Sequence, residues 1–306
     1  MRAPHVAAAR TAAVFLAAAI AAAEATAAPG IAGVAGTARA CVIDGESWGY
    51  RLGPHLAFLE DPTGELGPDE ALSPERAASY VSRAAQTISL GYSKSAFWFK
   101  GEARNESGRD LDCVLVLKEP AIESVELFAR GERLRSGAAV AVSERAVPSR
   151  ESVFKMRLKA GETEPILLRV RTDTSINLSF VLFEEDAYRR REAAGIFVVS
   201  LCFGALFFAI VYNAFLAVSL RDPAYGFYAV LVAGILLNRL LVLGYFQYYL
   251  APGSGRLNYY AILTATSLFT AAICTRQPPV GPDMFSIRLA MLGPDSVAAG
   301  VVATAG

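Results

Sequence analysis

The residues best suited to contact a ligand lie on a short aromatic segment in the first half of the chain. In SAFWFKGEAR (95–104), Trp98 stands between Phe97 and Phe99 and is followed two places later by Lys100. On a strand, successive side chains point to opposite faces, so Trp98 and Lys100 share one face and both phenylalanines the other. An open indole could stack on the apolar C–H face of a sugar ring. The alternative is that Trp98 fills the core, as most large aromatic side chains do.

Other aromatic and cationic residues could extend such a surface. Trp48 and Tyr92 are further aromatic candidates, and Arg169 together with Lys100 could line a groove for a polar ligand. The alternative for the two cations is a solvated position, because charged side chains on a half-exposed sheet mostly face water.

A second group of polar residues stands in an apolar segment of the second half. Asn238 and Arg239 are adjacent in AGILLNRLLVLGY (233–245). A charge at bilayer depth is costly, so such a side chain is expected to face the interior of a helix bundle and to have a partner there. The candidate partners are Tyr212, Asn213, Thr264, Thr266 and backbone carbonyls. Three roles stay open: a polar switch, a contact that only joins helices, and a pair with an acidic residue on a helix outside this chain.

Cysteine and histidine usage excludes several chemistries. Cys41 and Cys113 stand in the first half, where a disulfide between them is a candidate if the domain is exported. Cys202 and Cys274 lie in apolar segments, and no two cysteines form a CxxC pair. The chain has two histidines and a net charge of zero. We therefore expect no metal, no cofactor, no nucleic-acid partner and no enzymatic activity.

The first half has the short apolar runs and turn signals of an all-β sandwich. Alternation is plain in ILLRVRT (166–172), where Leu167 and Arg169 share one face and Leu168 and Val170 the other. Strands are predicted at 95–104, 112–118, 122–129, 152–160, 165–172 and 176–184. One helix is predicted at 73–84, because Ser73 and Pro74 form a good helix start.

The second half reads as membrane-spanning. Charged residues are dense before residue 193 and sparse from there to residue 275. Three spans are predicted, at about 193–220, 225–250 and 257–275, which would form an incomplete bundle. The remaining segment, 276–306, reads as a truncated tail or the start of a fourth span.

The N-terminus reads as an export signal. Two arginines precede the apolar run TAAVFLAAAIAAA (11–23), and Ala25 and Ala27 fit a small-residue cleavage site. We predict a signal peptide at 1–27, a linker at 28–44 and the exported sandwich at 45–188. Long domains are exported largely regardless of flanking charge. The sandwich is thus expected in the periplasm of a bacterium, with the helices in its inner membrane.

Two stretches give the chain a resemblance to a known family. The first is LGYSKSAFWFKGEARNES (90–107) with ESVELFARGE (123–132) and ILLRVRTDTSINLSFVLF (166–183). The second is GALFFAIVYNAFLAVSLRDPAYGFYAVLVAGILL (204–237) with LGYFQYYLAP (243–252). In this order they resemble the bacterial 7TM receptors with diverse intracellular signalling modules (7TMR-DISM). The likeness is to the type 2 extracellular domain followed by a truncated 7TM region.

The resemblance implies a function. The extracellular domain would be a jelly-roll sandwich akin to carbohydrate-binding modules, and it would bind a small ligand such as a sugar. The helices would relay binding to a downstream kinase or cyclase module that this chain does not contain. The competing hypothesis is an envelope adaptor or structural protein whose sandwich binds another protein through an edge strand.

Overall fold

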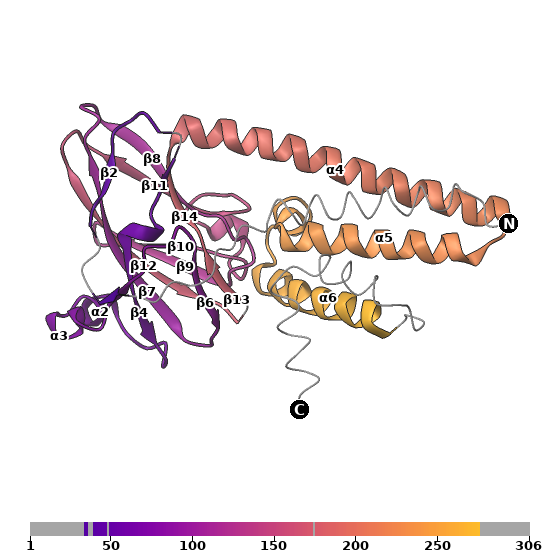
Figure 1. Ribbon diagram of the computed structural model, residues 1–306, viewed down its shortest axis with the longest axis horizontal. Coiled ribbons are helices and arrows are strands. Elements are labelled where there is room, and N and C mark those ends of the chain that lie inside the picture. Colours follow the sequence, from indigo (N-terminus) through magenta and orange to yellow (C-terminus); the bar gives the residue numbers. More distant parts are fainter. Residues whose placement is uncertain (1–33, 36–38, 48, 174, 276–306) are drawn as a thin grey trace. The chain divides into compact units, whose positions relative to one another are not determined.

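The computed structural model describes residues 34–35, 39–47, 49–173 and 175–275 of the 306-residue chain (Figure 1). These residues form a β-sandwich followed by helices, as the sequence predicts. The predicted signal peptide, most of the linker and the segment 276–306 lie outside the described residues.

The larger sheet of the sandwich has eight strands among the described residues. Their order is β1 (Val34–Ala35), β5 (Val81–Ser82), β4 (Leu56–Asp61), β7 (Ala96–Asn105), β12 (Thr163–Arg171), β9 (Ser124–Ala129) and β10 (Glu132–Ser136). The neighbours in this order run antiparallel. The eighth strand, β2 (Cys41–Ile43), pairs in parallel with β7. Part of the predicted linker 28–44 therefore belongs to the sandwich, because its Cys41 and Ile43 are apolar enough to join the core.

The second sheet has the order β11 (Ser152–Leu158), β8 (Leu111–Leu117), β14 (Phe180–Glu184) and β3 (Tyr50–Arg51). A two-stranded sheet of β13 (Ser175–Leu178) and β6 (Ile88–Tyr92) accompanies it. The single strand predicted at 176–184 is therefore two strands in different sheets, divided at Ser179. The backbone N–H of Ser179 donates instead to the Glu119 carboxylate at 3.1 Å.

The core lies between the inner faces of the two large sheets. Phe99 from β7 packs against Phe58 from β4 and against Phe180 from β14, with ring centroids 6.1 and 5.3 Å apart. Leu168 and Val170 of β12 point into the same core, and Leu167 points to the opposite face, which confirms the predicted alternation.

The predicted helix at 73–84 is wrong in extent. The segment forms only one single turn, α3 (Pro74–Ala77), and then enters strand β5, while another single turn, α2 (Pro68–Ala71), precedes it. Proline at the first position does start each turn, as expected. The helical turn ends at Ala77, and beyond it the side chain of Tyr80 is buried, with its hydroxyl donating to the Ala71 carbonyl at 3.1 Å.

Three helices follow the sandwich. Helix α4 (Glu185–Leu220) continues directly from β14, so it begins eight residues before the predicted span. Helix α5 (Pro223–Val242) starts after a tight turn in which the Asp222 side chain accepts a hydrogen bond from Ala224 N at 2.9 Å. Helix α6 (Gly255–Thr275) coincides with the third predicted span, although its side chains beyond Ala265 are outside the described residues.

The second predicted span, 225–250, is not one helix. Helix α5 ends at Val242, Gly244 takes a left-handed conformation (φ 75°), and a separate π-helical turn, η3, follows at Phe246–Leu250. A glycine with positive φ just past the last turn is a common helix stop.

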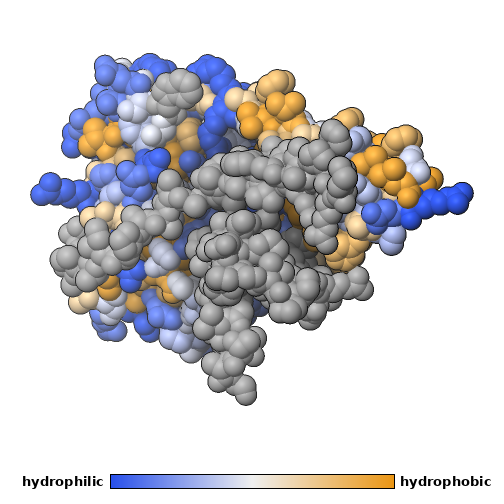
Figure 2. Space-filling model, turned by 45° about the vertical axis from the view of Figure 1, so that its right-hand side comes forward, coloured by the Kyte–Doolittle hydropathy of each residue, from blue (hydrophilic) through white to orange (hydrophobic). Residues whose placement is uncertain are grey.

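Among the described residues, α4 and α5 are long and apolar enough to cross a membrane. Large hydrophobic side chains on α4 are widely exposed, and Phe197, Phe208 and Phe215 are each at least 65% accessible. Figure 2 shows hydrophobic side chains gathered over the helices, whereas hydrophilic ones predominate over the sandwich. An apolar surface of this kind fits a hydrocarbon environment.

Candidate functional site

The outer face of the eight-stranded sheet carries two parallel rows of side chains across β7, β12, β9 and β10. The strand register places Lys100, Leu167, Phe128 and Arg133 opposite one another in the first row. The second row lies two residues along each strand from the first and consists of Trp98, Arg169, Glu126 and Arg135. Cross-strand neighbours on one face touch, so each row is a continuous line of side chains.

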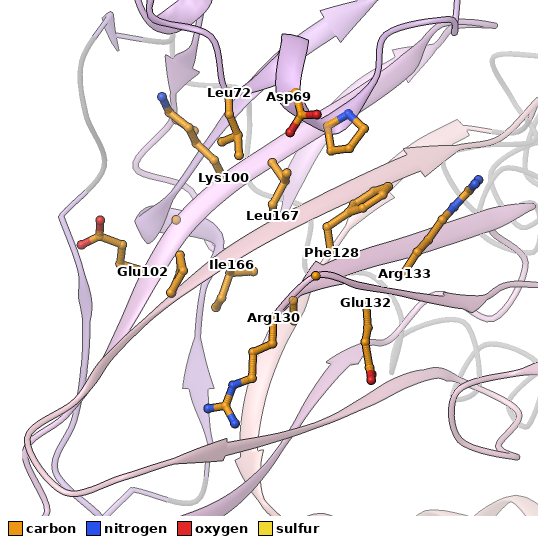
Figure 3. A pocket seen from close by; sticks show the side chains of 16 residues that line it. Asp69, Leu72, Lys100, Glu102, Phe128, Arg130, Glu132, Arg133, Ile166 and Leu167 are labelled. Atoms are coloured by element: carbon orange, nitrogen blue, oxygen red, sulfur yellow. The ribbon is translucent and has the colours of Figure 1, made fainter.

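A groove of about 720 Å³ lies over the first row (Figure 3). Leu167 and Phe128 form its apolar floor together with Ala57, and Leu72 at the end of α2 overhangs it. Lys100 borders the groove near Leu72, and Arg133 lies beyond Phe128. The groove thus combines an apolar floor with charged residues of both signs, the cations Lys100, Arg130 and Arg133 and the carboxylates Asp69, Glu102 and Glu132.

Trp98 lies beneath this surface and is fully buried. Its ring centroid is 5.3 Å from that of Phe128, and it packs in one cluster with Leu167 and Tyr80. Among the described residues its Nε1 has no hydrogen-bond partner. Trp98 therefore packs beneath Phe128 and does not line the groove.

Lys100 is held over an aromatic ring. Its Nζ lies 4.2 Å from the ring centroid of Tyr80, and no ion pair joins it to a carboxylate in the part of the chain that the structure describes. Burial raises the pKa of Tyr80 to about 12, so this ring stays neutral near physiological pH. Lys100 thus makes a cation–π contact with a neutral ring at the border of the groove.

The second row contains a buried carboxylate surrounded by arginines. Glu126 is 5% exposed, and its oxygens lie 2.5 Å from Arg133, 3.7 Å from Arg169 and 3.8 Å from Arg135. Arg169 also donates to the Gly64 carbonyl, in the turn after β4. These contacts fix the guanidinium of Arg133 at the border of the groove.

The structure brings together three of the five residues predicted for ligand contact. Lys100, Trp98 and Arg169 share the outer face, but only Lys100 lines the groove. Tyr92 is exposed on β6 and is not a lining residue, and Trp48 lies outside the described residues. The contact of any of these residues with a ligand stays a prediction.

The groove residues that sequence reasoning missed are Phe128, Leu167, Leu72 and Arg133. The alternation in SVELFA (124–129) places Phe128 beside Glu126 on one face and could have revealed the first. Nothing in the sequence shows that β9 pairs with β12 and that β10 follows on the other side of β9, which is what brings Phe128 and Arg133 to the groove.

The candidate disulfide is not present. Cys41 on β2 and Cys113 on β8 are both free thiols, buried in the core between the sheets. They belong to different sheets, and each fills space as a small apolar side chain. Burial raises the pKa of both thiols to about 11, so both stay protonated. No cluster of three metal-ligating side chains occurs among the residues that were described.

The predicted polar node of the membrane region is placed differently from expectation. Arg239 lies in the last turn of α5, because the helix ends at Val242, whereas a mid-span position was expected. A cation is favourable at a helix C-terminus, where the carbonyl dipoles point. Asn238 precedes it on the same turn. In α4, Asn213 is buried and donates to the Ala209 carbonyl at 2.7 Å, while Tyr212 stacks on Phe208 with ring centroids 6.1 Å apart.

Family models match both parts of the chain. The model described as 7TMR-DISM extracellular 2 matches residues 53–184, which are the sandwich. The model described as 7TM diverse intracellular signalling matches residues 196–276, a range that includes most of α4 and all of α5 and α6. The chain belongs to the 7TMR-DISM family. This 7TMR-DISM protein is accordingly a membrane protein of the sensor type, with an extracellular-type domain followed by membrane helices.

Other comparisons add little to the family assignment. A β-glucosidase from Kluyveromyces marxianus, in complex with glucose, aligns at 12% identity over 46% of this chain and 17% of that one, with a TM-score of 0.29. The insecticidal crystal protein Cry2Aa aligns at 9% identity over 33% of this chain and 19% of that one, with a TM-score of 0.21. The chain thus spans less than a fifth of each, and likeness at this level carries no argument. No curated protein matches the chain.

Proposed function

We propose that this protein is a receptor of a bacterial inner membrane whose periplasmic sandwich binds a small polar ligand, such as a sugar, in the groove over Leu167 and Phe128. It performs no catalysis. The membrane helices relay binding to a kinase or cyclase module on the cytoplasmic side.

The observation that carries the proposal is the makeup of the groove. Its floor is aliphatic and aromatic, and Lys100 and Arg133 stand at opposite ends of the row that forms it. With strands about 4.8 Å apart, three strand spacings separate these cations by roughly 14 Å. A sugar offers C–H faces to such a floor and hydroxyls to such donors. Binding sites generally combine a mainly apolar lining with a few placed polar groups.

The test is a binding titration on the full chain in lipid nanodiscs against a panel of neutral and acidic mono- and disaccharides. Lys100→Met should weaken the affinity of a panel member by on the order of tenfold, because a hydrogen bond to a charged donor is lost. Leu72→Ala should weaken it less, because only one wall of the groove recedes. The matched control is Lys94→Met, at an exposed lysine just before the same strand that does not line the groove.

Saturable binding that Lys100→Met and Leu72→Ala leave unchanged would place the ligand elsewhere and overturn the proposal. A failure of every sugar to bind, together with a protein captured by crosslinking to the sandwich, would favour the adaptor hypothesis instead.

A further inference from the structure

The loop between β10 and β11, residues 137–151, is held rigidly by the sandwich. Its first residues donate backbone hydrogen bonds to the β8–β9 connection, from Ala138 N to Ile122 O at 2.7 Å and from Ala139 N to Glu123 O at 3.0 Å. Gly137 has φ 124°, and a Cβ there would lie 2.4 Å from the Glu123 carbonyl oxygen, so glycine is required. We call this segment the β10–β11 loop.

A buried polar network joins this loop to the membrane part of the chain. Arg145, 6% exposed, donates to Val140 O at 3.2 Å, to Ser149 O at 2.6 Å and to Gln247 Oε1 in η3 at 2.6 Å. Gln247, 2% exposed, donates in return to Ala138 O at 3.1 Å and Val140 O at 3.0 Å. Asn258 of α6 donates to Gln247 Oε1 at 3.1 Å. Burying a guanidinium and two amides is costly unless they are hydrogen-bonded. Of their side-chain polar atoms, Asn258 Oδ1 is the one without a partner among the described residues, so the network specifies one arrangement of loop and helices.

The backbones also approach closely at this junction. Val142 N donates to Pro252 O at 2.8 Å, in the turn between η3 and α6. A Cβ on Gly255, the first residue of α6, would lie 2.4 Å from Ala139 O. Nearby, the guanidinium of Arg150 lies 5.0 Å from the centre of the Tyr245 ring. The contact therefore leaves no room for a side chain at residue 255.

Two strands that form the groove end at this junction. β10 carries Arg133 at the groove border and ends at Ser136, and the β10–β11 loop begins at the next residue, Gly137. β12 carries Leu167 on the groove floor, and just past its end the backbone N–H of Asp173 donates to the Tyr259 hydroxyl of α6 at 3.1 Å. At about 3.3 Å per strand residue, Arg133 and Ala138 are separated by roughly 17 Å.

We propose that the β10–β11 loop, through Arg145, Gln247 and Asn258, couples the groove strands to the helices. The loop acts on the C-terminal end of α5, through η3, and on the N-terminal end of α6. The helices are thereby moved by a shift of β10 and β12, in addition to the direct continuation of β14 into α4. The interpretation of this coupling as a response to a bound ligand rests on the proposed function. The coupling itself depends only on the contacts between the loop and the helices.

The test is hydrogen–deuterium exchange of the full chain in lipid nanodiscs with no sugar present. Gly255→Ala places a methyl group against Ala139 O, and Gln247→Ala removes the partner of Arg145. Coupling between two regions is reciprocal, so loosening the helix side must loosen the strand side. We expect exchange in residues 137–149 and in β10 to rise on the order of tenfold in both variants, because a buried hydrogen-bonded network is lost.

Gly253→Ala is the matched control, since a Cβ at residue 253 would meet nothing within 4 Å, and it should change nothing. Exchange in the β2–β7 pair, beside the start of β12 and away from the junction, should stay protected in every variant. If both variants expose only residues 246–258 and leave β10 and the loop unchanged, the coupling proposal is overturned. If Gly255→Ala loses exchange protection throughout the sandwich and therefore does not fold, the Gln247→Ala result alone supports or overturns the coupling proposal. Because the experiment contains no ligand, its result does not depend on whether the groove binds sugar.

Discussion

The eight-stranded sheet turns its inner face to the second sheet and its outer face to α2 and the groove. On the inner face, Phe97 and Phe99 pack with aliphatic side chains of both sheets. On the outer face, Trp98 and Lys100 lie two residues apart on β7, and Glu126 forms ion pairs with three arginines. Both faces bury large rings, yet only the outer one combines them with charge. Under the proposed function, the inner face serves stability alone, while the outer face also serves recognition.

The largest expected effect is on the inner face. Phe99→Ala should lower the free energy of unfolding by about 3–5 kcal/mol, because it leaves a cavity between Phe58 and Phe180. Chemical denaturation followed by tryptophan fluorescence measures this. Tyr92→Ala, at a 55% exposed ring on β6, is the control and should cost less than about 0.5 kcal/mol. Equal losses in the two variants would contradict the assignment of the core.

A smaller effect is expected from the charged row of the outer face. Glu126→Gln should destabilise the sandwich by about 1–3 kcal/mol, because three guanidiniums lose their shared carboxylate. Glu132→Gln, at an exposed carboxylate on the same hairpin, is the matched control and should be near neutral in the same denaturation experiment. A variant as stable as the parent would show that the outer face gains nothing from this carboxylate.

The smallest effect concerns pH and the end of the outer face. Burial would raise the pKa of Asp61, but hydrogen bonds from Thr63, Leu66 and Gly64, with Arg169 nearby, outweigh it and hold the pKa below its usual 3.8. A carboxylate with a depressed folded-state pKa stabilises the fold above its unfolded pKa, and this contribution is lost as pH falls through the folded-state pKa. The parent should therefore lose stability below about pH 4.

Asp61→Asn should flatten this acid limb and remove about 1 kcal/mol at pH 7, because the amide oxygen accepts less strongly than a carboxylate. Thermal unfolding between pH 2.5 and 7 measures both. Asp69→Asn, at an exposed carboxylate on α2, is the control. An unchanged acid limb in Asp61→Asn would mean that other carboxylates dominate the acid response of the sandwich.

Sequence reasoning predicted much of the fold from periodicity. The strands containing Trp98 and Leu168 were predicted because side chains alternate between the two faces of any strand, which gives the sequence a two-residue period. β3, β6 and β10 were missed, since two- to five-residue strands with mixed side chains carry little periodic signal. The end of α5 was missed because apolar residues continue through Leu250, although Gly244 was visible as a stop.

Local sequence alone predicts that an alternating β domain precedes apolar helices, and that Trp98 and Lys100 share a strand face. These properties depend on local period and composition, which neighbouring residues specify. Three contacts could be seen only once the chain was folded: Phe128 covers Trp98, Arg133 binds Glu126, and Arg145 binds Gln247 across 102 residues of sequence. Such contacts depend on strand order and on which loops dock, and these are set by the packing of the whole fold.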